Sequence, residues 1–251
     1  MLQYLIVCPL VFLAGLVDAI AGGGGIISLP AYLLAGVPAH TALGTNKLGS
    51  AMGTVVSTVR YAKNGYLKGK AVMAACSAAV AILGSTIGAR LALMVPDSVI
   101  DHMMLVVLPI VAAYVLFNRR MGDNDKTGTV PARRMFVLSI LAALFVGGYD
   151  GFYGPGTGTF LLLVLTGVAK MDIRSASAQT KVINLSSNTA ALVTFVINGK
   201  VLYPLGLAAG VCCIAGHYIG SGLVVHDGQK IVRPVVLVVL GALFIKILSG
   251  N

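Results

Sequence analysis

Charged residues are scarce in this sequence, and glutamate is absent altogether. Charged side chains make up 10% of the 251 residues, and every acidic residue is Asp. A soluble globular domain typically carries about 25% charged residues, so an ordinary soluble protein is excluded. Hydrophobic residues reach 57%. Together these values predict a polytopic membrane protein made of one integral domain, residues 1–251.

The motifs of common enzyme classes are missing too. The run Gly22 to Gly25 is not followed by the Gly-Lys-Ser/Thr of a phosphate-binding loop, and Gly154 to Gly158 lacks the spacing of a dinucleotide site. The sequence has no His/Cys cluster with metal-ligand spacing and no G-x-S-x-G elbow. We therefore expect no enzyme activity, no cofactor and no metal, and any transport must proceed without an ATPase in this chain.

Basic residues outnumber acidic ones by 18 to 8, which gives a net charge of +10. In a soluble chain this excess would suggest nucleic acid as a partner. In a membrane protein, Lys and Arg gather in cytoplasmic loops and set the orientation. We therefore expect the lipid bilayer and a small solute as partners, and no nucleic acid.

Two glycine-rich stretches interrupt the apolar segments. Asp18 to Pro30 contains four consecutive glycines, and Asp150 to Gly158 contains four more. Because each Gly costs a helix about 1 kcal/mol relative to Ala, both stretches predict broken helices. The freed backbone groups must then be buried in protein or line a wet cavity. The alternative is that these glycines only allow close packing between helices.

Most apolar segments have the length of about 20 residues that a spanning helix needs. The short segments 26–36 and 159–169 each follow a glycine break and are predicted to be half-helices or re-entrant arms. The predicted segments are 4–21, 26–36, 41–62, 71–95, 99–117, 135–149, 159–169, 175–197, 202–223 and 232–249.

The two halves of the sequence match each other at a nearly constant spacing, which indicates an internal duplication of residues 1–117 and 135–251. The matching features are Asp18 with Asp150, Gly22 with Gly154, Asn46-Lys47 with Thr180-Lys181, and Gly84-x-x-x-Gly88 with Gly216-x-x-x-Gly220. Each GxxxG pair is predicted to let two helices pack closely.

The distribution of basic residues between matching loops indicates that the repeats are inverted. The 60–70 loop is rich in Lys and Arg, whereas the matching loop of the second half holds only Lys200. Linker 118–134 is also basic and is predicted to be cytoplasmic, with both termini outside. Inverted repeats with broken helices are typical of secondary transporters that bind their substrate near the bilayer midplane.

Two lysines lie within predicted membrane helices at matching positions. Lys47, Ser50 and Thr54 have the spacing i, i+3, i+7, as do their counterparts Lys181, Asn184 and Asn188, so each trio shares one helical face. At 1.5 Å per residue each lysine is roughly 10 Å deep, where a charge is costly and indicates function. Snorkelling to the surface is the alternative, but it explains two matched lysines less well than one.

These observations predict a site for a small anion, to which the broken helices offer backbone N–H groups. The candidate substrate-binding residues are Gly23, Gly24, Gly25, Asn46, Lys47, Ser50, Gly154, Gly156, Thr157, Gly158, Thr180, Lys181, Asn184 and Asn188.

Asp18 and Asp150 each precede a glycine break, and three roles are open to them. Each Asp could pair with one of the lysines as a counter-charge, bind a coupling proton, or cap the half-helix that follows. A lone intramembrane histidine, His217, is interpreted as a packed hydrogen-bonding residue.

Three stretches together resemble the TauE/SafE family of bacterial and archaeal sulfite exporters and toluene-sulfonate uptake permeases. They are D-x-x-x-G-G-G-G-x-x-x-x-P from Asp18, A-L-G-T-N-K-L from Ala42, and Y-D-G-F-Y-G-P-G-T-G from Tyr149. The resemblance covers essentially the whole chain. It implies an inner-membrane permease for sulfite, sulfonates or related organosulfur anions.

We therefore expect an all-α secondary transporter of small anions. Each of its inverted repeats would hold a glycine-broken helix pair and three spanning helices. The alternatives are a passive anion channel on the same scaffold and a non-transporting membrane scaffold. The sequence leaves open the exact substrate, the direction of transport, the coupling ion and whether the chain forms homo-oligomers.

Overall fold

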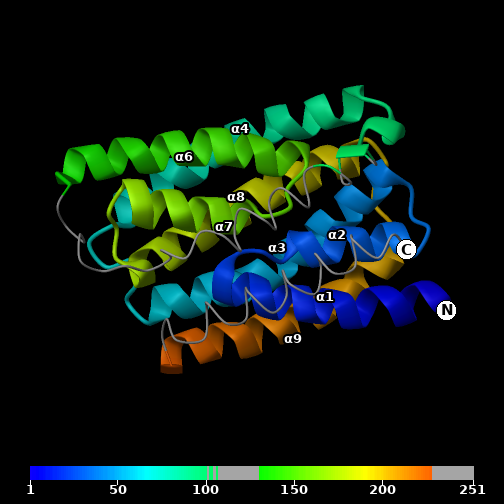
Figure 1. The fold of residues 1–251 in the computed structure, drawn as a ribbon, viewed down its shortest axis with the longest axis horizontal. Helices are drawn as coiled ribbons and strands as arrows, with labels where there is room; N and C mark the ends of the chain where they lie inside the picture. The colour runs from blue at the N-terminus through cyan, green and yellow to red at the C-terminus, as the bar shows by residue number, and fades with distance from the viewer. Residues whose placement is uncertain (101, 104–105, 107–129, 228–251) are drawn as a thin grey trace.

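The computed structural model describes residues 1–100, 102–103, 106 and 130–227, and the regular structure in these ranges is helical throughout. Most of the predicted segment 99–117, all of the segment 232–249 and most of linker 118–134 fall outside the described residues. Every other predicted segment lies on a helix. The helices (Figure 1) are α1 (Leu2–Ala21), α2 (Gly25–Leu34), α3 (Ala39–Lys63), α4 (Ala71–Met94), α6 (Ala132–Phe152), α7 (Thr157–Leu163), the π-helical η2 (Val164–Val168), α8 (Ile173–Ile197) and α9 (Tyr203–Asp227).

The first glycine stretch breaks the chain between α1 and α2, as predicted. Gly22 follows the last residue of α1 with a left-handed φ of 78°, and its N–H donates to the Asp18 carbonyl at 2.8 Å. This region of φ is open to Gly because it has no Cβ. Helix α2 then begins at Gly25.

The second break is shorter than predicted. Helix α6 does not end at residue 149 but continues through Asp150 and Gly151 to Phe152. Gly151 packs directly against the backbone of Ser85 on α4, so it belongs to a helix contact and not to the break. The interruption lies between Phe152 and α7, where Gly154 takes a φ of 99°.

Corresponding helices of the two halves run in opposite directions. The Nζ of Lys70, just before α4, lies 3.6 Å from Oδ2 of Asp172, just before α8, so these two helices start at the same end of the molecule. At the other end, the N–H of His40 at the start of α3 donates to Asp97, just after α4, at 3.0 Å. Helix α8 therefore starts where α3 finishes (Figure 1). These directions favour inverted repeats, whose sidedness in the membrane stays a prediction.

Cysteine labelling tests that sidedness. In a cysteine-free background, Gly65→Cys should react with an impermeant maleimide only from inside, and Gly199→Cys only from outside. The two glycines follow α3 and α8 and have similar positive φ values of 76° and 67°. Ser98→Cys is a second outside position. If positions 65 and 199 label from the same side, the inverted-repeat prediction is wrong.

The two halves exchange helices. Helix α4 packs against α6 and α8 of the second half, and α9 packs against α1 and α3 of the first. Gly84 and Gly88 face backbone atoms of α6, while Gly216 and Gly220 face backbone atoms of α1. A Cβ on Gly220 would lie 2.5 Å from the Leu16 carbonyl oxygen. The predicted close packing at both GxxxG motifs is confirmed.

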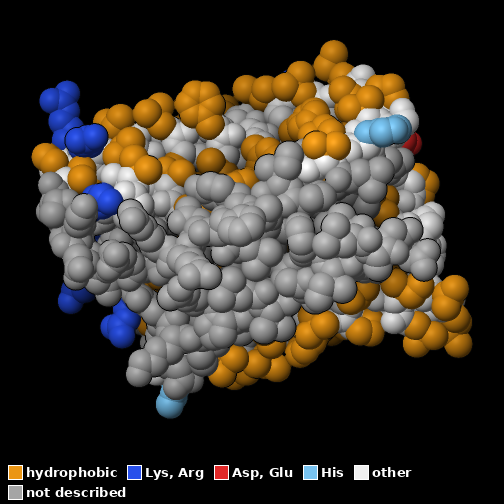
Figure 2. Space-filling view, in the orientation of Figure 1, with side chains coloured by type: hydrophobic (Ala, Val, Ile, Leu, Met, Phe, Trp, Pro, Cys, Tyr) orange, Lys and Arg blue, Asp and Glu red, His pale blue; other side chains and the backbone are white. Residues whose placement is uncertain are grey.

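The outer flanks formed by the described helices are rich in exposed apolar side chains, as a protein embedded in lipid requires. Helices α1, α4, α6 and α9 are each long and apolar enough to cross a membrane. Large side chains such as Ile87 on α4, Phe145 on α6 and Val211 on α9 are exposed by 58%, 70% and 63%. Figure 2 shows hydrophobic side chains along the flanks, with Lys and Arg gathered at the end where α6 begins. The protein is thus a multi-pass helical membrane protein.

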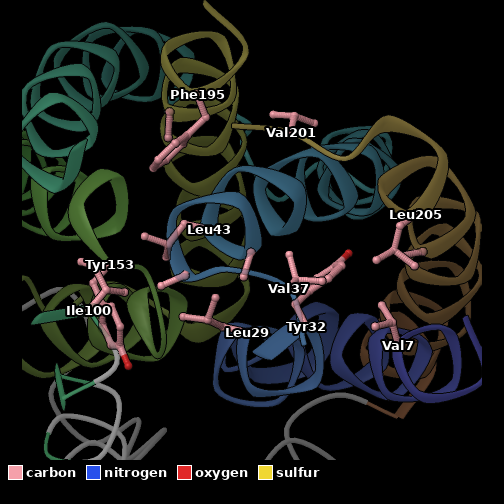
Figure 3. Close-up of a cluster of buried hydrophobic side chains, with 14 of the residues drawn as sticks. Val7, Leu29, Tyr32, Val37, Leu43, Ile100, Tyr153, Phe195, Val201 and Leu205 are labelled. Atoms are coloured by element: carbon pink, nitrogen blue, oxygen red, sulfur yellow. The ribbon is translucent and has the colours of Figure 1, made fainter. Parts of the chain in front are cut away.

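A buried apolar cluster holds the short helix α2 in place. Leu29 and Tyr32 of α2 share the cluster with Leu43 of α3, Phe195 of α8 and Leu205 of α9 (Figure 3). Helices α3 and α8, with 25 residues each, turn their more polar faces toward the centre of the molecule, where the candidate site lies.

Candidate functional site

The two glycine breaks meet at the centre of the molecule. The N–H of Thr159, in the first turn of α7, donates to the Gly22 carbonyl at 3.2 Å. A Cβ on Gly158 would lie 2.5 Å from the Gly22 Cα, so the two backbones touch without room for a side chain. The end of α1 and the start of α7 are therefore held against each other, with Asp18 one turn away.

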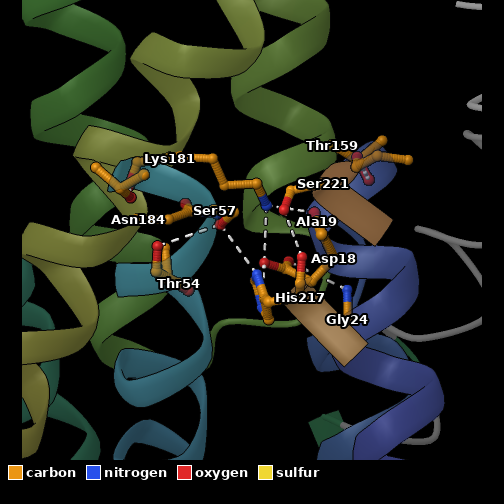
Figure 4. Close-up of polar contacts among 12 residues, drawn as sticks. Asp18, Ala19, Gly24, Thr54, Ser57, Thr159, Lys181, Asn184, His217 and Ser221 are labelled. Carbon is orange, nitrogen blue, oxygen red and sulfur yellow. Dashed lines mark hydrogen bonds and ion pairs between the residues drawn. The ribbon is translucent and has the colours of Figure 1, made fainter. Parts of the chain in front are cut away.

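Lys181 crosses from the second half to a carboxylate of the first. Its Nζ lies 2.8 Å from Asp18 Oδ2 and also donates to the Asp18 carbonyl (Figure 4). The Lys181 side chain is 2% exposed, which excludes snorkelling in this conformation. Asp18 Oδ1 additionally accepts from the N–H of Gly24 at 3.3 Å. Asp18 thus pairs with a lysine and also accepts a hydrogen bond from Gly24, the residue before α2.

Lys47 makes the reciprocal crossing from the first half to the second. Its Nζ lies 2.8 Å from Asp150 Oδ1, and the two side chains are 2% and 5% exposed. The other carboxylate oxygen, Oδ2, accepts from the Ser187 hydroxyl at 2.6 Å. Because burying a charge without a partner is very costly, each lysine and each aspartate depends on its partner in the opposite half.

A small cavity lies between these ion pairs. Its volume is about 30 Å³, room for about two water molecules. Predicted residues that line it are Asp18, Gly24, Gly25, Asn46, Lys47, Ser50, Asp150, Gly154, Thr157, Gly158, Asn184 and Asn188. Polar side chains of α3 and α8 and backbone atoms of both glycine breaks therefore meet at this cavity.

The other predicted residues lie nearby without lining the cavity. Lys181 reaches it through its bond to Asp18. Gly156, just before α7, has a left-handed φ of 82°, and Thr180 is buried at 2% exposure. Gly23 would place a Cβ 3.4 Å from the Thr159 hydroxyl.

The sequence argument missed part of the lining, above all His217. Its Nε2 lies 3.4 Å from Asp18 Oδ2, and its Nδ1 lies 3.0 Å from the Ser57 hydroxyl. Ser28 of α2 and Cys213 of α9 also line the cavity. A comparison of the two repeats could have drawn attention to His217. It stands one residue after the first Gly of its GxxxG motif, where the first half has Ser85.

Within the described ranges, no group of three or more His, Cys, Asp or Glu side chains lies close enough to hold an ion. The available chemistry is that of two buried ammonium groups, two carboxylates, one imidazole, and the amides and hydroxyls beside them.

The fold and the site together define a multi-pass membrane protein with a buried, ion-paired polar centre between two matching halves. Residues 7–247 match the family of sulfite exporters TauE/SafE, and the chain belongs to that family. Its members are membrane transporters and not enzymes, which agrees with the absence of catalytic motifs from the sequence.

Curated relatives cover nearly the whole chain. A probable membrane transporter protein, ORF9, of a Sinorhizobium species is 38% identical over 240 residues, 95% of this chain and 89% of the relative. A probable membrane transporter protein of Haemophilus influenzae is 34% identical over 90% of this chain and 87% of the relative. YfcA of Escherichia coli K12, also named a probable membrane transporter, is 32% identical over 95% and 87%. No solved structure matches significantly.

Proposed function

We propose that this protein is a secondary transporter of small anions, with sulfite, sulfonates or related organosulfur oxyanions as substrates. The single observation that carries the proposal is the pair of crossed ion pairs, Lys47 with Asp150 and Lys181 with Asp18. The preference for sulfur compounds comes from the family and not from the geometry.

In each ion pair, the lysine ammonium group is the anion site, and an aspartate carboxylate of the protein occupies it while no substrate is bound. A buried ammonium group needs a negative partner, because an unpaired buried ion costs several kcal/mol even after relaxation. In this conformation the Asp carboxylates fill that role. A substrate oxyanion would replace a carboxylate at the ammonium group, so binding becomes an exchange of one anion for another.

The crossed pairing also links binding to movement. Both Asp18 and Lys47 belong to the first half, and each is paired with a residue of the second. A displacement of one half against the other would therefore strain or break both pairs together. This is the behaviour that alternating access around a midplane site needs. The cavity of about 30 Å³ is too small for a sulfonate, so the substrate must enter with such a displacement.

The remaining lining supplies hydrogen bonds to a substrate. The Oδ1 atoms of Asn46 and Asn184 are buried and have no hydrogen-bond partner within the described part of the protein. Buried polar atoms are nearly always satisfied, so water or a donor group of a solute is expected to bind these two oxygens. An oxyanion needs donors instead, which the amide nitrogens of Asn46, Asn184 and Asn188 and the Ser50 hydroxyl can supply on both sides of the cavity.

The same proposal places the protein in the cytoplasmic membrane, with the 118–134 linker inside and both termini outside. Two other functions fit the fold: a passive anion channel and a non-transporting scaffold. The ion pairs favour a carrier, because an open channel would not need to release an internal counter-ion at every passage.

Counterflow into proteoliposomes tests the proposal. Purified protein should bind methanesulfonate or sulfite by calorimetry, more tightly than chloride or nitrate. Vesicles preloaded with unlabelled substrate should then take up labelled substrate faster than empty ones. Flux without this stimulation would indicate a channel, and the absence of binding and flux for the whole panel would favour the scaffold.

A further inference from the structure

The two ion pairs are not equivalent, although they occupy matching positions. Asp150 has a lysine and the Ser187 hydroxyl as side-chain partners. Asp18 has a lysine and a histidine, with His217 Nε2 at 3.4 Å from the same Oδ2 that Lys181 contacts. Figure 4 shows Lys181 and His217 converging on Asp18 from different helices. Within the described part of the chain, Asp18 thus has a histidine beside its lysine, whereas the partners described for the Asp150 carboxylate are a lysine and a hydroxyl.

The matching position in the other half carries no titratable group. The motifs Gly84-x-x-x-Gly88 and Gly216-x-x-x-Gly220 set Ser85 opposite His217 in the alignment of the repeats. The Ser85 hydroxyl donates to the Ser187 carbonyl at 2.6 Å. The second half alone has an imidazole at this position. Both motifs provide the same close helix packing, so packing does not explain why the second half has a histidine there.

The hydrogen bonds around His217 leave a place for one more proton. The Ser57 hydroxyl donates to the Thr54 carbonyl at 3.1 Å and lies 3.0 Å from His217 Nδ1. While Ser57 donates to Thr54, its oxygen can only accept a hydrogen bond from Nδ1–H. In a neutral imidazole Nε2 is then a bare acceptor, and it faces a carboxylate oxygen.

One added proton satisfies this whole chain of groups. With both ring nitrogens protonated, Nε2 donates to Asp18, Nδ1 donates to Ser57, and Ser57 donates to Thr54. The other neutral tautomer, with the proton on Nε2, would require Ser57 to leave Thr54 and turn toward Nδ1. While Ser57 stays bonded to Thr54, both ring nitrogens have partners only in the protonated state.

We propose that Asp18 and His217 form a proton site that couples the transport of each monovalent anion to one proton. This inference rests on the proposed function. With the site empty, Lys181 and Asp18 cancel and His217 is neutral. An anion bound to Lys181 would leave this buried cluster with a net charge of −1. A proton taken from hydronium onto Nε2 or Oδ2 returns the charge to zero and loosens Asp18 from Lys181.

The neighbouring groups leave that charge count unchanged. Besides Lys181 and His217, the ionisable groups near Asp18 among the described residues are Tyr61 of α3, whose hydroxyl donates to the Ala19 carbonyl at 2.7 Å, and the buried thiol of Cys213 on α9. Across the cavity lies the Lys47–Asp150 pair, which is neutral as a unit. When the site opens to the opposite side, the anion and the proton leave together.

Proton uptake on binding tests the inference. Methanesulfonate remains ionised throughout the neutral range, so any proton taken up in weakly buffered solution belongs to the protein. The wild type should take up close to one proton per bound anion at neutral pH. Asp18→Asn should bind the anion with no uptake, and His217→Gln should take up less than half as much. Ser85→Ala, at the position that matches His217 in the other half, is the control and should take up as much as the wild type.

The outcomes separate this inference from the proposed function. Anion binding without proton uptake by the wild type would overturn the coupling and leave the transporter intact. Full uptake by Asp18→Asn, or its loss in Ser85→Ala, would overturn the assignment to Asp18 and His217. If no anion of the panel binds, both proposals fail. Should His217→Gln not fold, the comparison of Asp18→Asn with Ser85→Ala still decides.

Discussion

Lys47→Met is expected to bind methanesulfonate at least about tenfold more weakly than the wild type, a loss of about 1.4 kcal/mol or more. Met keeps most of the apolar stem and removes the ammonium group that Asp150 holds at 2.8 Å. Because a bound anion depends on that charge, the loss falls on binding. Lys181→Met should behave in the same way. Calorimetric titration in detergent measures both.

The carboxylate left behind allows a binding effect to be separated from a folding effect. Lys47→Met leaves Asp150 buried without a cation, and breaking a buried pair in this way costs about 3–5 kcal/mol. The double variant Lys47→Met/Asp150→Asn removes both charges. It should recover most of the thermal stability and still bind as weakly as Lys47→Met. Asp150→Asn alone frees Lys47 from its internal competitor and should bind the anion at least as tightly as the wild type.

Arginine variants show whether an anion is bound through the positive charge of each lysine or through the shape of its side chain. Lys47→Arg and Lys181→Arg keep the positive charge, so each should be less harmful than the Met variant at the same position. Two results would count against the site: normal binding by both Met variants, or Arg proving as harmful as Met. The second would point to a steric or proton-carrying role of the amine, since Arg hardly ever deprotonates.

The helices were predictable because their signals are local. The four glycines from Gly22 to Gly25 predicted the break between α1 and α2, and α1 ends at Ala21. The second break was placed too early, because Gly151 serves a contact with α4 and not the interruption. Glycine can either break a helix or allow another helix to pack closely. Which of the two it does depends on whether a neighbouring backbone lies against it. The exchange of α4 and α9 between the halves depends on contacts distant in sequence, so no local pattern could indicate it.

The candidate site followed from burial and repetition. Two lysines at matching depths predicted a shared charged centre, and pairing with Asp18 and Asp150 was one of the open roles. The sequence did not say which Asp joins which Lys, because that depends on how the halves cross. His217 was interpreted as a packed residue, since a single His carries no helical pattern of its own. Its distance of 3.4 Å from Asp18 appears only once α1 and α9 are placed side by side.

Gly22→Ala is expected to lower transport at least about tenfold while the protein still inserts and folds. The new Cβ would lie 2.6 Å from the Gly158 Cα, so α1 and α7 must move apart. That shift displaces Asp18, one turn earlier, and the Gly158 backbone that lines the cavity. A misplacement of about 1 Å in a binding constellation can cost about a hundredfold in function. Initial rates of counterflow measure the loss.

Two other glycines isolate the contact from backbone strain. Gly65 has a φ of 76°, close to the 78° of Gly22, but a Cβ there meets nothing within 4 Å. Gly65→Ala therefore carries the strain alone, of order 1–3 kcal/mol, and should transport normally. Gly23→Ala lies within the same break, with its nearest neighbour at 3.4 Å, and should also be tolerated. If Gly22→Ala transports as well as these two variants, the contact between Gly22 and Gly158 only serves helix packing, and transport does not depend on it.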